Sequence, residues 1–472
     1  MYNEGGDPGT CGLHRRRAFW TFIITALGLG VVFLDISIVN VALQSISGGF
    51  NIGVTDLEWI VDAYTLAFAG LLLTAGAIGD RLGNKGIFLL GILIFAISSL
   101  LCGVAPDLGS LITGRVLQGV GAALIIPSSL TLLNHAYDDP RERARAFGSW
   151  GACGATAIAS GPLLGGLLIH LFGWRSIFLV NIPVGTLALI LGTVLIQKEK
   201  HVKGRHIDFA GLLTSLIALT ALVTALVEGP RLGWKSTPIV GLVLLFVISA
   251  FIWVAIESRH PDPMLPLKLF GIRQFSVICV VGLVMNIAFY GVVFTLSLYF
   301  QKIRHLTPFE TGLSFLPMSG IMIVGNIISG RLAARCGGHV PVLIGSLVTA
   351  VFFGSAAATA TASVNLLFLI FQVAMVGVGI SLVIPPLVAI CLGSVEKTQI
   401  GVASGALNTS RQIGTAAGVA LLGSFLTMQS GFLWGFRGGL LLAAALSVLA
   451  AALTFFFVRP TAPIAIESVP LE

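Results

Sequence analysis

Two aspartates and one arginine stand inside long apolar stretches of this sequence, where charged side chains are rare. Asp35 lies in GVVFLDISIVN (30–40), Asp62 in WIVDAYTLA (59–67) and Arg115 in ITGRVLQGVG (112–121). Burial disfavours the ionised form of a carboxyl group, and a nearby guanidinium favours it. Such a group can take up or release a proton when its access to water or to a cation changes. The three residues therefore predict a proton-exchange site.

The composition identifies the elements that must position these residues. Of the 472 residues, 56% are hydrophobic and 10% are charged, and the mean hydropathy is +0.99. A water-soluble domain has about a quarter of its residues charged. The composition therefore excludes a soluble globular protein and predicts an integral membrane protein.

The apolar residues are grouped in runs of about the length needed to cross a bilayer as a helix, roughly 20 residues. Backbone groups in lipid must be hydrogen-bonded internally, and the alternating pattern of a membrane β-barrel is absent, so we expect helices. The sequence thus predicts an all-α integral membrane protein with fourteen spans at about 19–43, 57–79, 86–105, 109–133, 145–171, 176–196, 209–227, 238–256, 274–300, 311–333, 341–361, 364–392, 402–427 and 437–458.

The basic residues predict the orientation of these spans. If the N-terminus is cytoplasmic, the inner segments hold 19 Lys and Arg residues and the outer loops hold 6, and Arg115 and Arg411 within spans complete the 27. We expect a multi-pass protein of the cell membrane, acting as a monomer, with cytoplasmic tails at 1–18 and 459–472. The net charge of +7 is spread over many short loops, so no nucleic-acid partner is expected.

The predicted depth of the three charged residues is similar. At 1.5 Å per residue, Asp35 lies about 12 Å below the outer end of its span, and Asp62 and Arg115 lie about 9 Å below theirs. A purely structural ion pair that locks the three spans together is the alternative. Asp62 could also simply face an outer vestibule. Glu58 lies so near the start of its span that we expect a solvated helix cap.

The sequence also contains an internal repeat. GVGAALIIP at 119–127 returns as GVGISLVIP at 377–385, an offset of 258 residues. Two six-helix halves, 19–200 and 274–458, would flank a two-helix insert at 207–257. Repeats related by an axis along the membrane normal are a recurring plan of secondary transporters, with the substrate site between the halves.

Five motifs, in order, resemble those of the major facilitator superfamily, and with fourteen spans the set is similar to its drug/proton antiporter family. They are LDISIVNVAL (34–43), WIVDAYTLA (59–67), GAIGDRLGNKG (76–86), RVLQGVGAA (115–123) and ASGPLLGG (159–166). The resemblance implies export by alternating access, driven by the proton gradient without a cofactor. It also implies that Asp35 belongs to an antiporter motif and that Arg115 takes part in proton transfer.

The resemblance further implies two gating elements. Asp80 and Arg81 would form a cytoplasmic latch, with Asp138 or Asp139 as the acid near the arginine. The second element is the stripe of small residues that contains Gly161 and Gly165, which Pro162 bends. Small residues at this spacing allow close helix packing in lipid. We expect this stripe, and its counterpart ending in Gly414 and Gly418, to contact helices of the opposite half.

The predicted substrate cavity combines aromatic and polar side chains, which suit amphipathic and often cationic organic molecules. No acidic residue stands in the interior of the second half's spans, so export of dications is not expected. Arg411 leaves an anionic or zwitterionic substrate open. The candidate residues are Phe33, Asn40, Trp59, Tyr64, Gln118, Trp150, Asn286, Phe289, Tyr290, Asn408 and Arg411.

Other classes of function remain as alternatives to export. One is proton-coupled or facilitated uptake of a polar metabolite, and another is a non-transporting membrane sensor or scaffold. An enzyme is not expected, because GxSxG, HExxH and P-loop patterns are absent from the sequence. The six cysteines are scattered without a CxxC pair, so we expect no metal site.

Overall fold

The computed structural model describes residues 8–137, 139–197, 209–259, 265, 267–361, 363–396, 399–427 and 431–458. Every regular element in these ranges is helical. The first half contains α1 (Pro8–Phe50), α2 (Val54–Leu82), α3 (Asn84–Gly103), α4 (Leu108–Ala136), α5 (Pro140–Phe172), α6 (Ser176–Leu179) and α7 (Asn181–Leu195). The middle of the chain forms α8 (Phe209–Leu232), α9 (Thr237–Arg259) and the short 3₁₀ helix η1 (Leu267–Gly271). The second half contains α10 (Arg273–Lys302), α11 (Pro308–Cys336), α12 (His339–Thr359), α13 (Leu366–Gly393), α14 (Ile400–Leu426) and α15 (Phe432–Phe457).

Each of the fourteen apolar runs in the sequence coincides with helical structure, and the sixth run is divided between α6 and α7. Within the described residues, twelve helical segments are long and apolar enough to cross a membrane. The other two long helices are α2 and α14. Asp56, Glu58 and Asp62 lie in the first nine residues of α2, and α14 carries the polar segment NTSRQ (408–412).

Within each half, short connections join successive long helices, which run in opposite directions. We call the end at which α1 begins the near end, and the end at which α1 stops at Phe50 the far end. Side-chain caps start several helices at the far end. Asp107 accepts a hydrogen bond from the Ser110 backbone N–H at 2.8 Å, and Thr307 forms a reciprocal capping box with Glu310.

The internal repeat has a direct structural counterpart. Gly119 of α4 lies against the backbone of α2 at Tyr64, and Gly377 of α13 lies against α11 at Met318. Two residues further on, Gly121 contacts Gly91 of α3, and Gly379 contacts Gly345 of α12. The repeated GVG sequence therefore serves the same close packing of three helices in each half.

The two stripes of small residues contact a helix of their own half, so the expectation of contacts with the opposite half was wrong. Gly161 and Gly165 of α5 lie against Ser37 and Ile38 of α1. In the same way, Gly414 and Gly418 of α14 lie against the α10 backbone at 283–287. The small residues do allow close helix packing, as expected, because a side chain at any of these positions would overlap the neighbouring helix.

Contacts between the halves lie toward the far end. Ser297 of α10 donates a hydrogen bond to the carbonyl of Asn40, and Gln301 donates one to the carbonyl of Val41 at 3.1 Å. A Cβ atom built on Gly166 of α5 would lie 2.7 Å from the Cα atom of Phe309 on α11.

Two glycines nearer the other end have open space beside them. Gly30 of α1 and Gly151 of α5 have no atom within 4 Å of a Cβ position, apart from their own helix backbone. The hydrogen bonds and the close backbone contact described above therefore join the halves at the far end.

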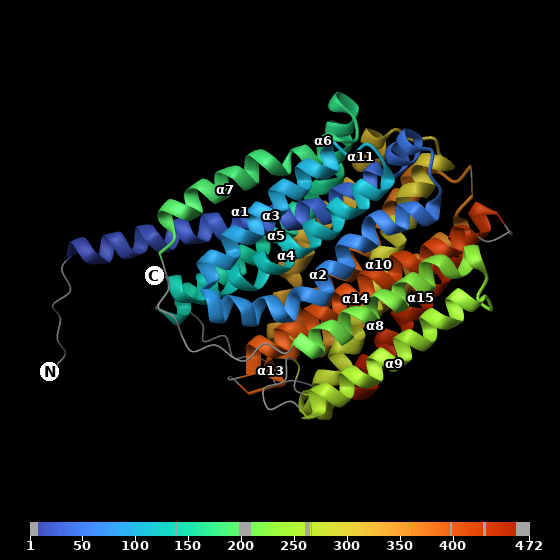
Figure 1. The fold of residues 1–472 in the computed structure, drawn as a ribbon. Coiled ribbons are helices and arrows are strands. Elements are labelled where there is room, and N and C mark those ends of the chain that lie inside the picture. The colour runs from blue at the N-terminus through green and yellow to red at the C-terminus, as the bar shows by residue number, and fades with distance from the viewer. Residues whose placement is uncertain are drawn as a thin grey trace.

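The two middle helices lie beside the junction of the halves. Figure 1 shows α8 next to α14 and α2, with α9 outside α8. Leu66 of α2, Val223 of α8 and Ala420 of α14 belong to one buried apolar cluster. Helix α8 thus packs on both halves at once, and it covers the seam between α2 and α14.

Candidate functional site

Asp35 and Arg115 form a buried ion pair between α1 and α4. The exposed fraction of the side chain is 0% for Asp35 and 1% for Arg115. The other carboxylate oxygen of Asp35 accepts hydrogen bonds from Gln118 at 3.1 Å and from Asn181 at 3.0 Å. Taking two charges out of water costs several kcal/mol per ion, and additional hydrogen bonds offset that cost. The pair is therefore sealed and fully partnered in this conformation.

The Arg115 guanidinium connects this pair to α2. Its Nε donates a hydrogen bond to the carbonyl of Ile60 at 2.9 Å, and its Nη1 donates one to Gln118 at 2.9 Å. The Tyr64 ring lies under the guanidinium, 4.4 Å from ring centroid to Cζ. Tyr64 and Gln118, predicted to line the cavity, thus lie in the buried network around Arg115.

Asp62 lies apart from this ion pair. Its side chain has 0% exposure, and both carboxylate oxygens lack a hydrogen-bond partner among the described residues. Neither an ion pair nor a hydrogen bond joins it to Asp35 or Arg115 within those residues. The structure thus brings together two members of the predicted trio and places the third in a separate buried position.

Glu58 is buried, so the expectation of a solvated cap was wrong. One turn before Asp62 on the same face of α2, its side chain is 1% exposed and lies against Gly423 of α14. Its carboxylate oxygens also lack a hydrogen-bond partner in the described part of the chain. Helix α14 of the other half covers Glu58, although a position so near the start of a span looks exposed in the sequence.

A third carboxyl group reaches this seam from α8. Glu228 accepts a hydrogen bond from the Trp59 indole N–H at 3.0 Å and forms an ion pair with Arg231 at 2.7 Å. Trp59 is thereby held at the contact of α2 and α8. We call Glu58, Asp62 and Glu228 the seam carboxyl cluster.

The candidate cavity residues of the second half do gather around one space. A pocket between α10, α13 and α14 contains about 320 Å³ of empty volume, part of it open to solvent. Asn286, Phe289, Tyr290 and Arg411 line it. Asn408 lies one turn before Arg411 and accepts a hydrogen bond from its guanidinium at 3.5 Å.

The remaining cavity candidates lie in the first half. Phe33 is half-buried and packs on Gly154 of α5, and Trp150 is half-buried with its indole nitrogen lacking a partner among the described residues. Asn40 is buried at the contact of α1 with α10. Phe33 and Trp150 thus keep exposed surface, and Asn40 belongs to the far-end contact.

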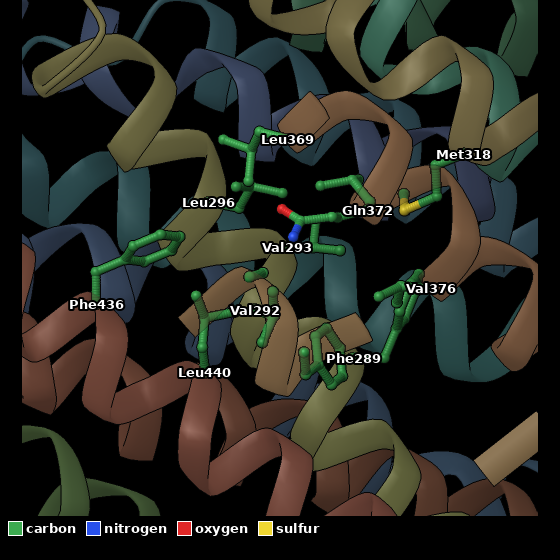
Figure 2. A pocket seen from close by; sticks show the side chains of 13 residues that line it. Phe289, Val292, Val293, Leu296, Met318, Leu369, Gln372, Val376, Phe436 and Leu440 are labelled. Atoms are coloured by element: carbon green, nitrogen blue, oxygen red, sulfur yellow. The ribbon is translucent and has the colours of Figure 1, made fainter. Parts of the chain in front are cut away.

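A second cavity lies inside the second half and is almost wholly apolar. It contains about 390 Å³ of empty volume, part of it open, between α10, α11, α12, α13 and α15. Figure 2 shows Gln372 as the polar side chain among hydrophobic neighbours such as Leu296, Met318 and Phe436. Gln372 donates hydrogen bonds to Ser355 at 2.7 Å and Thr359 at 3.2 Å, so its amide is already occupied.

The predicted latch falls partly on residues that the structure leaves undescribed. The side chain of Asp80 and the whole of Asp138 lie outside the described residues, and Arg81 is exposed at the near end. Asp139 accepts a hydrogen bond from the backbone N–H of Glu142 at 3.3 Å. Pro162 lies toward the far end, at the contact of α5 with the other half. Its carbonyl oxygen occupies the place where a side chain on Gly312 of α11 would be.

Sequence reasoning missed Asn181, Ser99 and Glu228. Ser99 accepts a hydrogen bond from Gln118 at 2.8 Å and lies 3.4 Å from the Asn181 amide nitrogen. The isolated asparagine in FLVNIPVG (178–185) was a detectable signal, because an amide in an apolar run needs a partner. Glu228 had no such signal, because the predicted span ended at 227.

Comparisons with known proteins place this geometry in a family. Residues 25–419 match the profile of the Major Facilitator Superfamily. The chain is 37% identical over 414 residues to the methylenomycin A resistance protein of Streptomyces coelicolor, covering 86% of each chain. It is 31% identical over 419 residues to the tetracenomycin C resistance and export protein of Streptomyces glaucescens, covering 88% of this chain and 77% of the relative.

A solved structure agrees at the level of the fold. A bacterial homologue of the human lysosomal transporter Spinster aligns with a TM-score of 0.67 at 15% identity, over 96% of this chain and 97% of that one. The match to the family profile spans both halves and the helices between them. The chain therefore belongs to the major facilitator superfamily and is a membrane transporter rather than an enzyme.

Proposed function

We propose that this protein is a proton-coupled antiporter that exports small amphipathic organic compounds, such as drugs or antibiotics, from the cell. In this proposal all fourteen long helical segments cross the cell membrane, and the protein works as a monomer without a bound cofactor. Relatives named for antibiotic resistance and export, similar over most of the chain, support export. The observation that carries proton coupling is the Asp35–Arg115 pair, sealed inside the first half.

An ionisable side chain in a membrane span is costly and defaults to a functional role. Arg115 neutralises the Asp35 carboxylate in this conformation. Protonation of Asp35 removes the charge that holds the guanidinium, so the contacts of Arg115 with α2 must rearrange. Because α2 also forms the seam with α14, protonation of Asp35 would change the contact between the halves.

The orientation that the basic residues predict places the near end in the cytoplasm. In this proposal the structure, with its halves joined at the far end, is the inward-facing state, and the pocket beside Arg411 takes cargo from the cytoplasm. Opening of the far end would expose the α2–α14 seam, and with it Asp62, to the outside. Protons would enter there and leave inward as cargo moves outward.

Inside-out membrane vesicles with an acidified lumen test this function. Addition of a transported drug should raise the luminal pH, because protons leave the lumen as the drug enters. Asp35→Asn should abolish this response while the protein remains folded and inserted. A luminal pH dye and drug accumulation are measured together, and a protonophore should collapse accumulation by the wild type.

Asp107→Asn is the matched control. Asp107 is an exposed cap at the start of α4, and its pKa is held below its usual value chiefly by the hydrogen bond from the Ser110 backbone N–H. Asparagine caps a helix equally well, so this variant should transport like the wild type. Wild-type exchange by Asp35→Asn would refute the assignment, and flux accelerated only by the opposite gradient would identify uptake.

A further inference from the structure

The charges that face the inside of the molecule are unequal in sign. Asp35, Asp62 and Glu58 have essentially no exposed surface, and Asp35 is neutralised by Arg115. Arg411, in contrast, is only partly buried and lines the pocket between α10, α13 and α14. Among the described residues, no carboxylate lies within ion-pair distance of its guanidinium. The accessible charge at this pocket is therefore positive.

The surroundings of Arg411 hold it in place without using its charge. Its aliphatic stem lies beside Gly282 of α10, where a Cβ atom would be 3.3 Å from the Arg411 Cγ. Among the described residues, the hydrogen bond of its guanidinium is a long one, of 3.5 Å, to Asn408. An arginine is always protonated in a protein, and its planar fork matches a carboxylate through two parallel hydrogen bonds.

The rest of the pocket is amphipathic. Tyr290 and Asn286 supply polar groups, and the Tyr290 hydroxyl makes no hydrogen bond to any described residue. Met285, Phe289 and Ile384 supply apolar surface. An apolar lining with a few polar groups and one charge is the usual construction of a site that orients a small organic ligand.

We propose that Arg411 is the anchor for an anionic group, and that the cargo class of this exporter is an amphipathic organic acid, bound by its carboxylate. The inference rests on the proposed function in that it names the cargo of the same cavity. The carboxylate lies against the Arg411 guanidinium and the Tyr290 hydroxyl, and the ring system of the acid lies on Phe289 and Met285.

Equilibrium binding to the purified full-length protein tests this proposal. The probes are three aromatic carboxylic acids of different ring systems, each paired with its methyl ester, and rhodamine 110 with its ester rhodamine 123 is one pair. The wild type should bind at least one acid about tenfold to a hundredfold more tightly than its ester, because a charged hydrogen-bonded pair is worth that much. Failure of every acid to exceed its ester overturns the proposal.

Variants at Arg411 assign the preference to this residue. Arg411→Gln should lose the preference for the acid and keep the affinity for the ester, which also reports that the protein is folded. Arg411→Lys should keep part of the preference, since it retains the charge but not the planar fork. Arg331→Gln removes an exposed arginine at the near end of α11 and should bind like the wild type.

The outcomes separate this proposal from the proposed function. An undiminished preference for the acid in Arg411→Gln would overturn the anion site even if pH-driven export is normal. A preference that depends on Arg411, in a protein that moves none of the probes in acid-loaded vesicles, would overturn export and leave the anion site standing.

Discussion

At the scale of single residues, the first half of this transporter isolates its charges and the second half leaves one accessible. Asp35 and Arg115 satisfy each other, with Gln118 and Asn181 completing the hydrogen bonds of the carboxylate. Position 373, which is the repeat counterpart of Arg115, is a valine. The described part of the second half therefore has no counterpart of this buried ion pair, and the charge of Arg411 is left for another partner.

Removing one member of the buried pair should destabilise the protein. Asp35→Asn leaves the Arg115 guanidinium buried without a counter-charge, which costs about 3 to 5 kcal/mol. The double variant Asp35→Asn with Arg115→Gln removes both charges and should regain most of that loss. Thermal unfolding in detergent measures the stability, and the vesicle assay measures exchange.

The same two variants distinguish a proton-coupling role of the Asp35–Arg115 pair from a purely structural one. If the pair couples protons, the double variant recovers stability and still fails to exchange drug for protons. Recovery of both stability and exchange would mean that the pair is purely structural.

Glu58 should tolerate loss of its charge. Neither oxygen of its carboxyl group has a partner among the described residues, so an ionised carboxylate would be unpaired and costly there. An amide has the same shape and no charge. Glu58→Gln should therefore unfold at the wild-type temperature or above it, measured at neutral pH in detergent. A loss of about 3 kcal/mol or more would instead indicate a paired anion at this position.

At the scale of helices, close approach depends on glycines whose partners could not be read from their spacing. Gly161 and Gly165 bring α5 onto α1 within one half, whereas Gly166, the next residue, faces α11 of the other half. Adjacent positions on one helix thus serve packing within a half and closure between halves. Contacts of the second kind join Pro162 and Gly166 of α5 to residues 308–312 of α11.

Adding a side chain at the contact of α5 with α11 should disturb far-end closure. The Cβ atom of Gly312→Ala would overlap the carbonyl of Pro162, a backbone atom that cannot move aside alone. We expect a lower unfolding temperature and slower drug accumulation in vesicles. Gly320→Ala, on the same helix, meets no atom within 4 Å and is the matched control. Equal behaviour of the two variants would show that this contact is not part of the cycle.

The hydrogen bond between Trp59 and Glu228 should fasten α8 to the first half. Trp59→Phe keeps the aromatic packing and removes the indole donor. Because Glu228 keeps Arg231 as a partner, the cost should be that of one hydrogen bond to a charged group, about 1.5 to 3 kcal/mol. Thermal unfolding of the variant measures it, and an unchanged midpoint would mean that apolar packing alone holds α8.

At the scale of the whole molecule, the proposed transport cycle requires the far end to open. A reversible bis-methanethiosulfonate cross-link between cysteines introduced at His170 of α5 and Phe309 of α11, in a chain without its native cysteines, should lock this end. The two side chains face each other across the halves, with ring centroids 6.3 Å apart.

The cross-linker should stop drug accumulation, and a reductant should restore it. Each single-cysteine variant treated with the same cross-linker is the control. Undiminished accumulation with the cross-link fully formed would show that the far end stays closed during transport.

The helices and the charged residues among them were predictable from the sequence, because lipid imposes strict rules of length and polarity on a membrane span. Asp35, Asp62 and Arg115 were grouped because their predicted depths agreed, but depth carries no information on direction around a helix, and only Asp35 and Arg115 are paired. Asn181 and Glu228 were missed because their importance depends on which helices are neighbours. Glu58 was misjudged for the same reason, since α14 covers it.

By itself, the sequence determined the all-helical membrane architecture, the duplicated halves and the identity of the charged residues within the spans. These follow from composition, periodicity and repetition, which are local properties of a chain in lipid. Only the tertiary structure decided which half each glycine faces, which carboxyl groups are paired and that Arg411 is accessible. Those properties depend on contacts between helices far apart in sequence, and hydropathy carries no information about which helices meet.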